Sequence, residues 1–381
     1  MKKSLLILLT FCIVMLIGCP TEQAESEPEP ISYDVANINY DPAHSECVMD
    51  IYRNDTAVRP VVMLIHGGAW ITIPAMGTAF GRSGMVQFKD QFLNNGYHVV
   101  NIDYRLIKLN IQFSFDNSAN PDPNNLSSLP TIDDYPNDID YTDMLNDIEA
   151  AVQFLYDNSD DYKIDTSNIV MYGYSAGAHL AELYSYKVTN SPIPVKLCVG
   201  RAGPADFSNT AFRECKILDT FTNSATSAVS AAFNLPVSSA TTFISSIAIP
   251  MLKHFFKVSL DADNELLENT MRCWIITNLL GIETDVTSDI NAIAEATKNQ
   301  DKIHDASPIY HVSANSPRTI LLHGEKDELV PYSMATSLAA KLGTKCELIP
   351  MPHSGHSLDD PQDSTELVDF NNKVLQALQS L

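Results

Sequence analysis

The sequence predicts an α/β protein with a mainly parallel central sheet and helices on both faces. Three observations predict this class. Short apolar runs alternate along the chain with segments whose apolar residues recur at helical spacing. Several of these runs are continuously apolar, as in strands that are buried on both faces. Hydrophobic residues make up 45% of the 381 residues, which is enough for a full core.

Strands and helices alternate in a consistent order. Strands are expected at residues 46–52, 61–65, 98–103, 168–172, 195–200, 318–323 and 346–350. Helices are expected at residues 80–94, 144–158, 176–187 and 367–378, with another between the last two strands. Each helix carries the chain back so that the next strand lies parallel to the previous one.

Two stretches interrupt the alternation. Residues 110–142 are rich in Asp, Asn, Ser and Pro and predict a long acidic surface loop. Its aspartates could bind calcium, but no D-x-D-x-D-G pattern occurs, so a solvated loop is favoured. Residues 206–304 are mostly helix-like and predict a helical lid insertion over the sheet edge. Lids shape pockets and exclude water from the reacting groups.

The N-terminus predicts export and lipidation. Lys2 and Lys3 precede an apolar run at 5–18, which is short for a membrane span and fits the core of a signal peptide. The following Cys19 completes a pattern similar to the lipobox of bacterial lipoproteins. We predict a signal peptide at 1–18, a lipid on Cys19 and a disordered acidic tether at 19–31 before a folded domain at 32–381. An ordinary signal peptide and an uncleaved anchor are the alternatives.

These segments predict a location in the bacterial cell envelope, lipid-anchored on the periplasmic or outer surface. The formal net charge of −23 excludes nucleic acid as a partner, because phosphate binding needs clustered Lys and Arg. Contact with a membrane is expected through the N-terminal lipid alone. The seven cysteines show no metal-ligand spacing, so no metal site is expected. A disulfide between Cys215 and Cys273 is one expectation, and buried free thiols are the other.

A serine lies on a predicted turn between a strand and a helix. Residues 171–180 read MYGYSAGAHL, which contains the G-x-S-x-G pattern of a nucleophile elbow. Gly173 and Gly177 remove side chains that would clash where strand and helix cross. Ser175 is then held in a strained conformation that exposes its hydroxyl group. The helix that begins at Ala176 points its N-terminal amides at the same place, where they favour negative charge.

A glycine-rich segment follows the strand at 61–65. It reads HGGAW, and its backbone can approach a substrate closely. Attack on an acyl group creates a tetrahedral oxyanion, which amide donors stabilise. We expect the amides of Gly67, Gly68, Ala69 and Ala176 to supply this oxyanion hole.

A base and a carboxylate are expected after the serine in the order Ser, Asp, His. Asp327 follows the strand at 318–323, and His356 follows the strand at 346–350. His353 is the alternative base. Glu325 is the alternative carboxylate, with Asp359 and Asp360 as more remote candidates.

These residue types predict a serine hydrolase that works through an acyl-enzyme. His356 would take the proton of Ser175 as it attacks the acyl carbon, and Asp327 would fix the tautomer of His356. His356 would then protonate the leaving group, and water would repeat the cycle on the acyl-enzyme. The chemistry needs no cofactor or metal. The expected partner is a small molecule with an acyl group.

Six motifs in order carry a family resemblance: VVMLIHGGAW, NIDYRL, GYSAGAHLA, ASPIYHV, LLHGEKDELVP and HSGHS. Over roughly residues 45–205 and 305–375 the chain resembles the α/β-hydrolase superfamily. It is most similar to carboxylesterases of the hormone-sensitive-lipase-like and feruloyl/acetyl-esterase-like branch. Its HGG-x-W segment also resembles kynurenine formamidase. The resemblance implies an α/β-hydrolase fold and a triad of Ser175, Asp327 and His356. It also implies a hydrolase that cleaves carboxylic esters, with a small-molecule ester as substrate.

The chain departs from the family pattern twice. Ala69 stands where the lipase branch usually has a third glycine, and Ala178 stands where a second glycine often follows Gly177. Two other functions stay open. One is an amide-cleaving relative, either arylformamidase-like or a serine peptidase. The other is a non-catalytic surface lipoprotein, against which the complete set of Ser, Asp, His and HGG argues.

Overall fold

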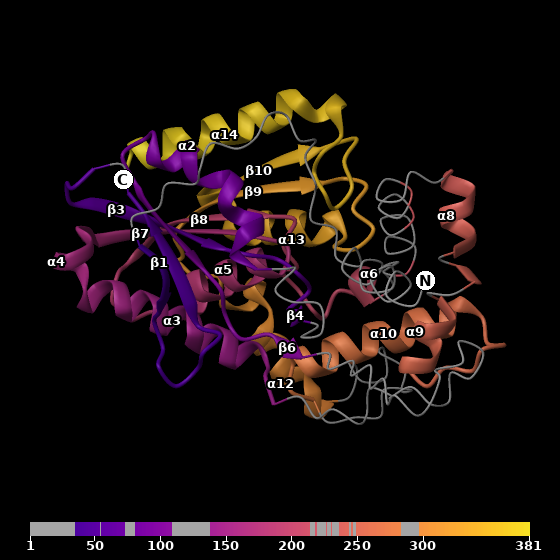
Figure 1. Cartoon of the computed structure of the whole chain (residues 1–381). Coiled ribbons are helices and arrows are strands. Elements are labelled where there is room, and N and C mark those ends of the chain that lie inside the picture. Colours follow the sequence, from indigo (N-terminus) through magenta and orange to yellow (C-terminus); the bar gives the residue numbers. More distant parts are fainter. Residues whose placement is uncertain are drawn as a thin grey trace.

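The centre of the molecule is a sheet of eight strands in the order β1-β2-β5-β3-β7-β8-β9-β10 (Figure 1). The computed structural model describes residues 35–53, 55–72, 81–108, 138–213, 236–243, 249–282 and 297–381, with single positions between 218 and 246. Strand β2 pairs antiparallel with β1 and β5, and every other neighbouring pair is parallel. The predicted fold class is confirmed.

The strands of the large sheet lie where the sequence predicts them, except for the first. The eight strands are β1 (Val35–Asn39), β2 (Val48–Tyr52), β3 (Arg59–Ile65), β5 (His98–Ile102), β7 (Ile164–Tyr174), β8 (Val195–Arg201), β9 (Arg318–Gly324) and β10 (Cys346–Met351). A separate parallel pair joins β4 (Ile71–Thr72) and β6 (Ile107–Lys108). Strand β1 was not expected. It is a partly exposed edge strand, so its sequence VANIN lacks the apolar run that marks the buried strands.

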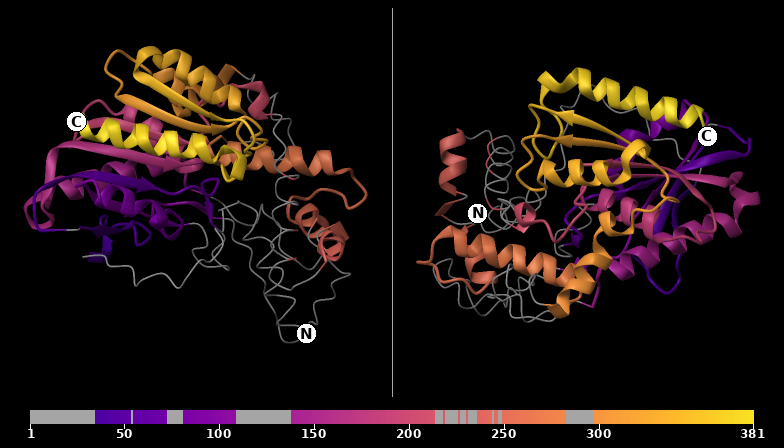
Figure 2. Two further views of the ribbon diagram at one scale, coloured as in Figure 1. Left: turned by 90° about the horizontal axis from the view of Figure 1, so that it is seen from above. Right: turned by 180° about the vertical axis from the view of Figure 1, so that it is seen from behind.

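Helices cover both faces of the sheet (Figures 1 and 2). On one face α2 (Lys89–Leu93) and α14 (Ser364–Gln379) pack on one apolar core. On the other face α3 (Tyr141–Asp157) and α5 (Ala176–Lys187) pack on a second core, beside α13 (Tyr332–Leu342). A short helix α4 (Ser159–Tyr162) precedes β7. The neighbours Val61 and Val62 of β3 belong to opposite cores, as the alternation of a strand requires.

The helix predicted at 80–94 is present as two consecutive helical elements. The chain forms a 3₁₀ helix, η3 (Arg82–Phe88), followed by the short α2. Gly84 lies inside this stretch, and glycine disfavours a continuous α-helix. Arg82 also donates its backbone N–H to Asp103 at 2.8 Å, which ties the start of η3 to the end of β5.

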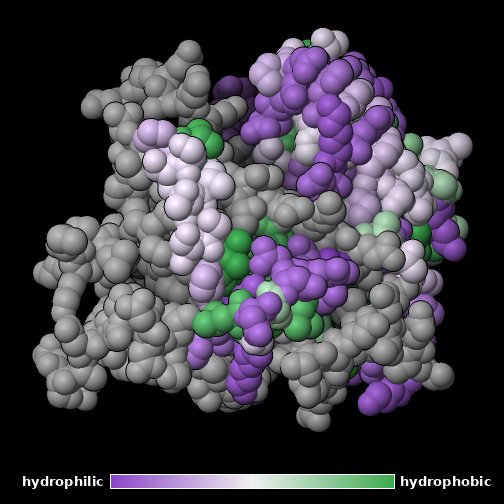
Figure 3. Space-filling model, turned by 90° about the vertical axis from the view of Figure 1, so that its right-hand side faces the viewer, coloured by the Kyte–Doolittle hydropathy of each residue, from purple (hydrophilic) through white to green (hydrophobic). Residues whose placement is uncertain are grey.

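The segment between β8 and β9 is largely helical in its described part. It contains α6 (Thr210–Arg213), α8 (Val237–Phe243), α9 (Ile249–Phe255), α10 (Asn264–Leu279), α12 (Thr297–Ala306) and the 3₁₀ helix η7 (Pro308–His311). Helices α8 to α10 lie on the side toward which β9 and β10 point (Figures 1 and 2). On this side a small group of hydrophobic residues lies beside strongly hydrophilic ones (Figure 3). A lid function for this segment stays a prediction.

The two ends of this insertion are bound to each other. Ile309 donates its backbone N–H to the carbonyl of Ala205 at 3.1 Å. Phe207 donates its N–H to the hydroxyl of Ser307 at 2.9 Å. The insertion therefore leaves and rejoins the sheet at one place.

Several predicted features lie outside the described residues. They are the signal peptide at 1–18, Cys19, the tether at 19–31, most of the loop at 110–142, and Cys215. Lipidation and the envelope location therefore stay predictions, as does the pairing of Cys215 with Cys273. Cys47, Cys198 and Cys346 carry free thiols. Among the helices that the structure describes, none combines the length and the apolar character needed to cross a membrane.

Helix α5 carries a buried carboxyl group. Glu182 is 1% exposed, and its Oε2 finds no hydrogen-bond partner within the described part of the chain. Its Oε1 lies so close to the backbone of β8 that a Cβ atom on Gly200 would approach it to 2.2 Å. Burial raises the pKa of Glu182 to about 8, so the group is protonated at neutral pH.

A Glu182→Gln variant is expected to be more stable than the wild type at pH 8. In the unfolded chain Glu182 loses its proton above pH ~4.3, whereas in the folded protein it keeps this proton. The wild-type free energy of unfolding therefore falls as pH rises from there to the folded pKa of about 8. The amide mimics the neutral acid and avoids this loss, which is on the order of 5 kcal/mol. Urea unfolding of both proteins between about pH 5 and pH 8 measures the difference. Parallel pH curves would contradict it, and the exposed Glu149→Gln variant on α3 is the control.

Candidate active site

Ser175 occupies a sharp turn between β7 and α5. Its φ of 54° and ψ of −121° are rare for a residue with a side chain, and such strain is concentrated at functional sites. Its backbone N–H donates to the carbonyl of Arg201 at 2.8 Å, and its carbonyl accepts from the N–H of His179 at 3.0 Å. The turn is therefore fixed on both sides of the serine.

The two glycines of the elbow stand where strand and helix almost touch. A Cβ atom on Gly173 would lie 2.2 Å from the carbonyl oxygen of Gly177. A Cβ atom on Gly177 would lie 2.1 Å from the carbonyl oxygen of Ile65 at the end of β3. No side chain fits at either position, which is the physical reason for the G-x-S-x-G pattern.

The structure brings together the three side chains that were predicted as a triad. Nε2 of His356 lies 2.9 Å from Oγ of Ser175. Nδ1 of His356 lies 2.7 Å from Oδ2 of Asp327. They come from the ends of β7, β9 and β10. With its proton on Nδ1, the imidazole of His356 leaves Nε2 free to accept the hydroxyl hydrogen of Ser175.

The carboxylate of Asp327 is fully buried and held by several donors. Its Oδ1 accepts backbone N–H groups of Leu329 at 2.9 Å and Val330 at 2.8 Å. Burial by itself raises the pKa of Asp327. The charges and hydrogen bonds of His356 and His323 outweigh it and keep this pKa well below its usual range. Asp327 is therefore ionised at neutral pH.

His323 is a neighbour of the triad whose contacts were not predicted from the sequence. Its Nε2 lies 2.7 Å from the carbonyl oxygen of Val330 and 3.4 Å from Oδ2 of Asp327. It therefore braces the loop that carries the carboxylate. The available signal was a histidine at the end of a predicted strand, four residues before Asp327.

The loop of His356 is anchored separately. The hydroxyl of Tyr174 donates to the carbonyl of His356 at 2.9 Å. The carboxylate of Asp363 accepts the backbone N–H groups of His353 and Ser354 and the hydroxyl of Ser354. These bonds hold the imidazole over the serine.

The alternative residues lie elsewhere. The side chains of His353 and Glu325 are exposed. Asp359 accepts a hydrogen bond from Ser357, and Asp360 accepts one from the backbone N–H of Gln362. The described geometry thus favours His356 and Asp327 over all four.

The predicted oxyanion segment lies against the serine. A Cβ atom on Gly67 would lie 3.1 Å from Cβ of Ser175, so this backbone passes directly beside the predicted nucleophile. Gly68, Ala69 and Trp70 have positive φ angles of 115°, 50° and 62°. Ala69 thus adopts the left-handed conformation that glycine prefers.

His66 supports the start of this segment. Its Nδ1–H donates to the carbonyl of Gly67 at 2.6 Å, and its ring stacks on Tyr104 at a centroid distance of 4.4 Å. The hydroxyl of Tyr104 donates to the carbonyl of His66 at 2.8 Å. Burial, partly opposed by the charge of Asp103, lowers the pKa of His66, so the ring is neutral at pH 7.

One group of possible metal ligands lies in the described part of the chain. Asp41, Cys47 and Asp147 place ligand atoms within 4.8 Å of one another. Arg105 already binds Asp147 through its side chain at 2.7 Å and its backbone N–H at 2.8 Å. Burial raises the pKa of Cys47 to about 12, whereas a metal needs the thiolate. We assign no metal to this group.

Several solved structures share the fold. A truncated carbohydrate esterase from gut microbiota is 18% identical, with a TM-score of 0.51, and the match covers 92% of this chain and all of that one. Thermogutta terrifontis esterase 2 phosphoramylated by tabun is 14% identical, with a TM-score of 0.53. That match covers 93% of this chain and 97% of the Thermogutta chain. A bifunctional GH43-CE protein of Bacteroides eggerthii is 19% identical, with a TM-score of 0.52. The match covers 89% of this chain, which spans 38% of that protein's length.

Comparison with curated proteins gives no match. The BD-FAE family model, in contrast, matches residues 49–115, 135–252 and 274–342, more than half of the chain. The match includes the glycine-rich segment, the elbow and Asp327. On this evidence the chain belongs to the BD-FAE family of α/β-hydrolase-type esterases.

Proposed function

We propose that this protein hydrolyses carboxylic esters through an acyl-enzyme on Ser175, with His356 as general base and Asp327 as its partner. The observation that carries the proposal is the continuous path from Oγ of Ser175 to Nε2 of His356 at 2.9 Å and from Nδ1 to Oδ2 of Asp327 at 2.7 Å. A serine hydroxyl becomes a nucleophile when a positioned base removes its proton.

The first half of the reaction forms the acyl-enzyme. Oγ of Ser175 attacks the ester carbonyl carbon as its proton moves to Nε2 of His356. The charge that develops on the carbonyl oxygen would be met by amides of Gly67, Gly68, Ala69 and Ala176. The ionised Asp327 stabilises the protonated imidazole, which then donates its proton to the alcohol oxygen as that bond breaks.

The second half releases the acid. A water molecule gives a proton to Nε2 of His356 and attacks the acyl carbon, and the bond to Oγ of Ser175 breaks. The proton then returns to Oγ, which restores the starting state. Each step moves one proton along the same path, so the triad needs no other acid or base.

Carbohydrate esters with small acyl groups are the first substrates we propose. The names of two structural neighbours, a carbohydrate esterase and a GH43-CE protein, support this class. Amide substrates are the second class, because the same triad can cleave them and the pocket decides between the two. A non-catalytic role is disfavoured, since such a role needs no aligned proton path.

The test is covalent labelling of residues 32–381. We expect a fluorophosphonate to modify Ser175 with one label per protein molecule, which mass spectrometry of the tryptic peptide measures. The same modification should abolish hydrolysis of p-nitrophenyl acetate. The phosphoramylation of the Thermogutta esterase by tabun supports the expected labelling by an organophosphorus reagent. If the protein is folded and hydrolyses the ester while Ser175 stays unmodified, the proposal is wrong. Acetylated xylo-oligosaccharides, methyl ferulate, N-formylkynurenine and a peptide amide then separate ester from amide substrates.

A further inference from the structure

A buried pair of aromatic side chains lies behind the oxyanion segment. Nε1–H of Trp70 donates to Nδ1 of His179 at 3.1 Å. Nε2–H of His179 donates to the carbonyl of Ala306 at 2.8 Å. Trp70 is 4% exposed and His179 is fully buried. Each ring nitrogen of His179 thus has one partner, and these partners specify a single tautomer of the neutral ring.

The backbone at Trp70 is strained. Ala69 and Trp70 are consecutive residues with φ of 50° and 62°, a conformation that bulky residues rarely adopt. The turn is closed by a hydrogen bond from the N–H of Ile71 to the carbonyl of Gly68 at 3.1 Å. Such strain persists only where surrounding contacts over-determine the conformation. The anchored indole of Trp70 is one of these contacts.

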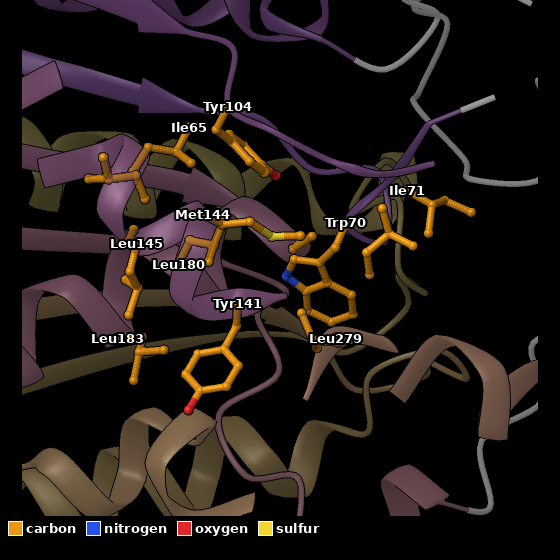
Figure 4. Packing of buried hydrophobic residues seen from close by; sticks show 14 of the residues in the cluster. Ile65, Trp70, Ile71, Tyr104, Tyr141, Met144, Leu145, Leu180, Leu183 and Leu279 are labelled. Atoms are coloured by element: carbon orange, nitrogen blue, oxygen red, sulfur yellow. The ribbon is translucent and has the colours of Figure 1, made fainter. Parts of the chain in front are cut away.

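The surroundings of the pair are apolar. Trp70 lies near Met144, Leu279 and Ile71 in the close-up view (Figure 4). The ring of His179 meets Trp70 and Phe207 edge to face, with centroids 5.4 Å and 5.0 Å apart. Burial lowers the pKa of His179 to about 4, so the ring stays neutral and Nδ1 remains an acceptor. In this environment the indole N–H has a directional partner that water cannot replace.

His179 also belongs to the helix that starts at the nucleophile. Its N–H donates to the carbonyl of Ser175 at 3.0 Å, in the first turn of α5. The same residue therefore joins three segments that are far apart in sequence: the turn at 68–71, the nucleophile helix, and the end of α12 at Ala306. A rigid link between the turn and the helix fixes the distance between an oxyanion amide and the serine.

We propose that Trp70 and His179 are positioning residues that hold the strained turn, and so the amides of Gly68 and Ala69, in register with Ser175. The inference rests on the proposed esterase function and deepens it. Donors of an oxyanion hole act on charge that exists only in the transition state. Loss of the pair should therefore lower kcat while substrate binding changes little.

The first test compares His179→Leu with His179→Gln. Leucine removes both hydrogen bonds, and we expect kcat for p-nitrophenyl acetate to fall by about 10- to 100-fold with KM changed less than about threefold. Affinity for an aryl trifluoromethyl ketone, which forms a tetrahedral oxyanion on the serine, should fall in parallel. Glutamine offers one acceptor and one donor, so it should restore most of kcat.

The second test uses the donor side of the same bond. Trp70→Phe keeps an aromatic ring but removes the indole N–H, and we expect a loss of kcat similar to that of His179→Leu. The double variant should lose little more than either single variant, because both changes remove one shared interaction. Fully additive losses would contradict a shared role.

The indole N–H itself gives a readout that does not depend on activity. The chain has two tryptophans, so Trp274→Phe identifies the Trp70 indole signal in a proton–nitrogen correlation spectrum. In His179→Leu this signal should shift and exchange faster with solvent, and in His179→Gln it should stay protected.

The matched control is His98→Leu. His98 is also a buried histidine bound to a backbone carbonyl, that of Ala57 at 3.1 Å, but it lies at the start of β5. It should lower Tm and leave kcat unchanged. If wild type is labelled and active while His179→Leu lowers only Tm, the positioning role is overturned and the esterase proposal stands. If folded wild type is neither labelled nor active, the esterase proposal itself fails.

Discussion

Replacing Ser175 with alanine is expected to lower kcat for ester hydrolysis by about a millionfold. The substitution removes the only atom that can form the acyl bond and leaves His356 with no hydroxyl to deprotonate. The Cβ atom and the backbone contacts to Arg201 and His179 remain, so the fold should be kept. Stopped-flow and end-point assays with p-nitrophenyl acetate, together with circular dichroism, measure both expectations.

Ser185→Ala is the matched control for this substitution. Ser185 is a buried serine of the same helix, and its hydroxyl donates to the carbonyl of Ala181 at 2.6 Å. Its loss should leave kcat unchanged. A folded Ser175→Ala protein with wild-type turnover would mean that the acyl group is not carried by this residue.

Asp327→Asn is expected to lower kcat by about 10⁴-fold with a small change in KM. The carboxylate accepts the Nδ1 proton of His356 at 2.7 Å, whereas an amide can turn its NH₂ group toward the ring. The imidazole would then carry its proton on Nε2, where it cannot accept the proton of Ser175. Steady-state kinetics over a range of pH measures the loss.

The same variant should change how stability depends on pH. The pKa of Asp327 is lowered in the folded state, so its charge stabilises the fold above about pH 4, where a free aspartate is ionised. That contribution is lost as pH falls toward the lowered pKa. The free energy of unfolding should therefore fall less steeply in acid for the Asn variant.

Glu325→Gln provides the control for Asp327, because it removes an exposed carboxylate from the same loop. It should have wild-type kcat and a wild-type acid profile. Equal losses in the two variants would mean that the general charge of the loop matters and not its contact with His356.

The chemistry-bearing residues were readable from the sequence because each follows a predicted strand with an apolar centre. The runs before Gly67, Ser175 and Asp327 fix the strands, and parallel strands end at one edge of a sheet, where their loops meet. The glycines then mark the close approaches. Strand ends and glycines could therefore nominate Ser175, and together with the family resemblance they favoured Asp327 and His356 over their neighbours.

The supporting residues could not be read in this way. His179 looks like one more residue of a helix, and its role depends on Trp70 and Ala306, which lie 109 and 127 residues away along the chain. His323 looks like the last residue of a strand. Strand β1 was missed because an exposed edge strand has no continuous apolar run. Contacts that depend on packing leave no local pattern.

The bonds between Ala205 and Ile309 and between Phe207 and Ser307 determine what a change in the length of the insertion costs in conformational entropy. They close the insertion at its base, so residues added far from this base lengthen a loop whose two ends are already held together. The entropy of closing such a loop grows only with the logarithm of its length, so long inserts cost little. Lengthening the insertion away from its base is therefore expected to change the free energy of unfolding little, provided that Ala306 keeps its bond to His179.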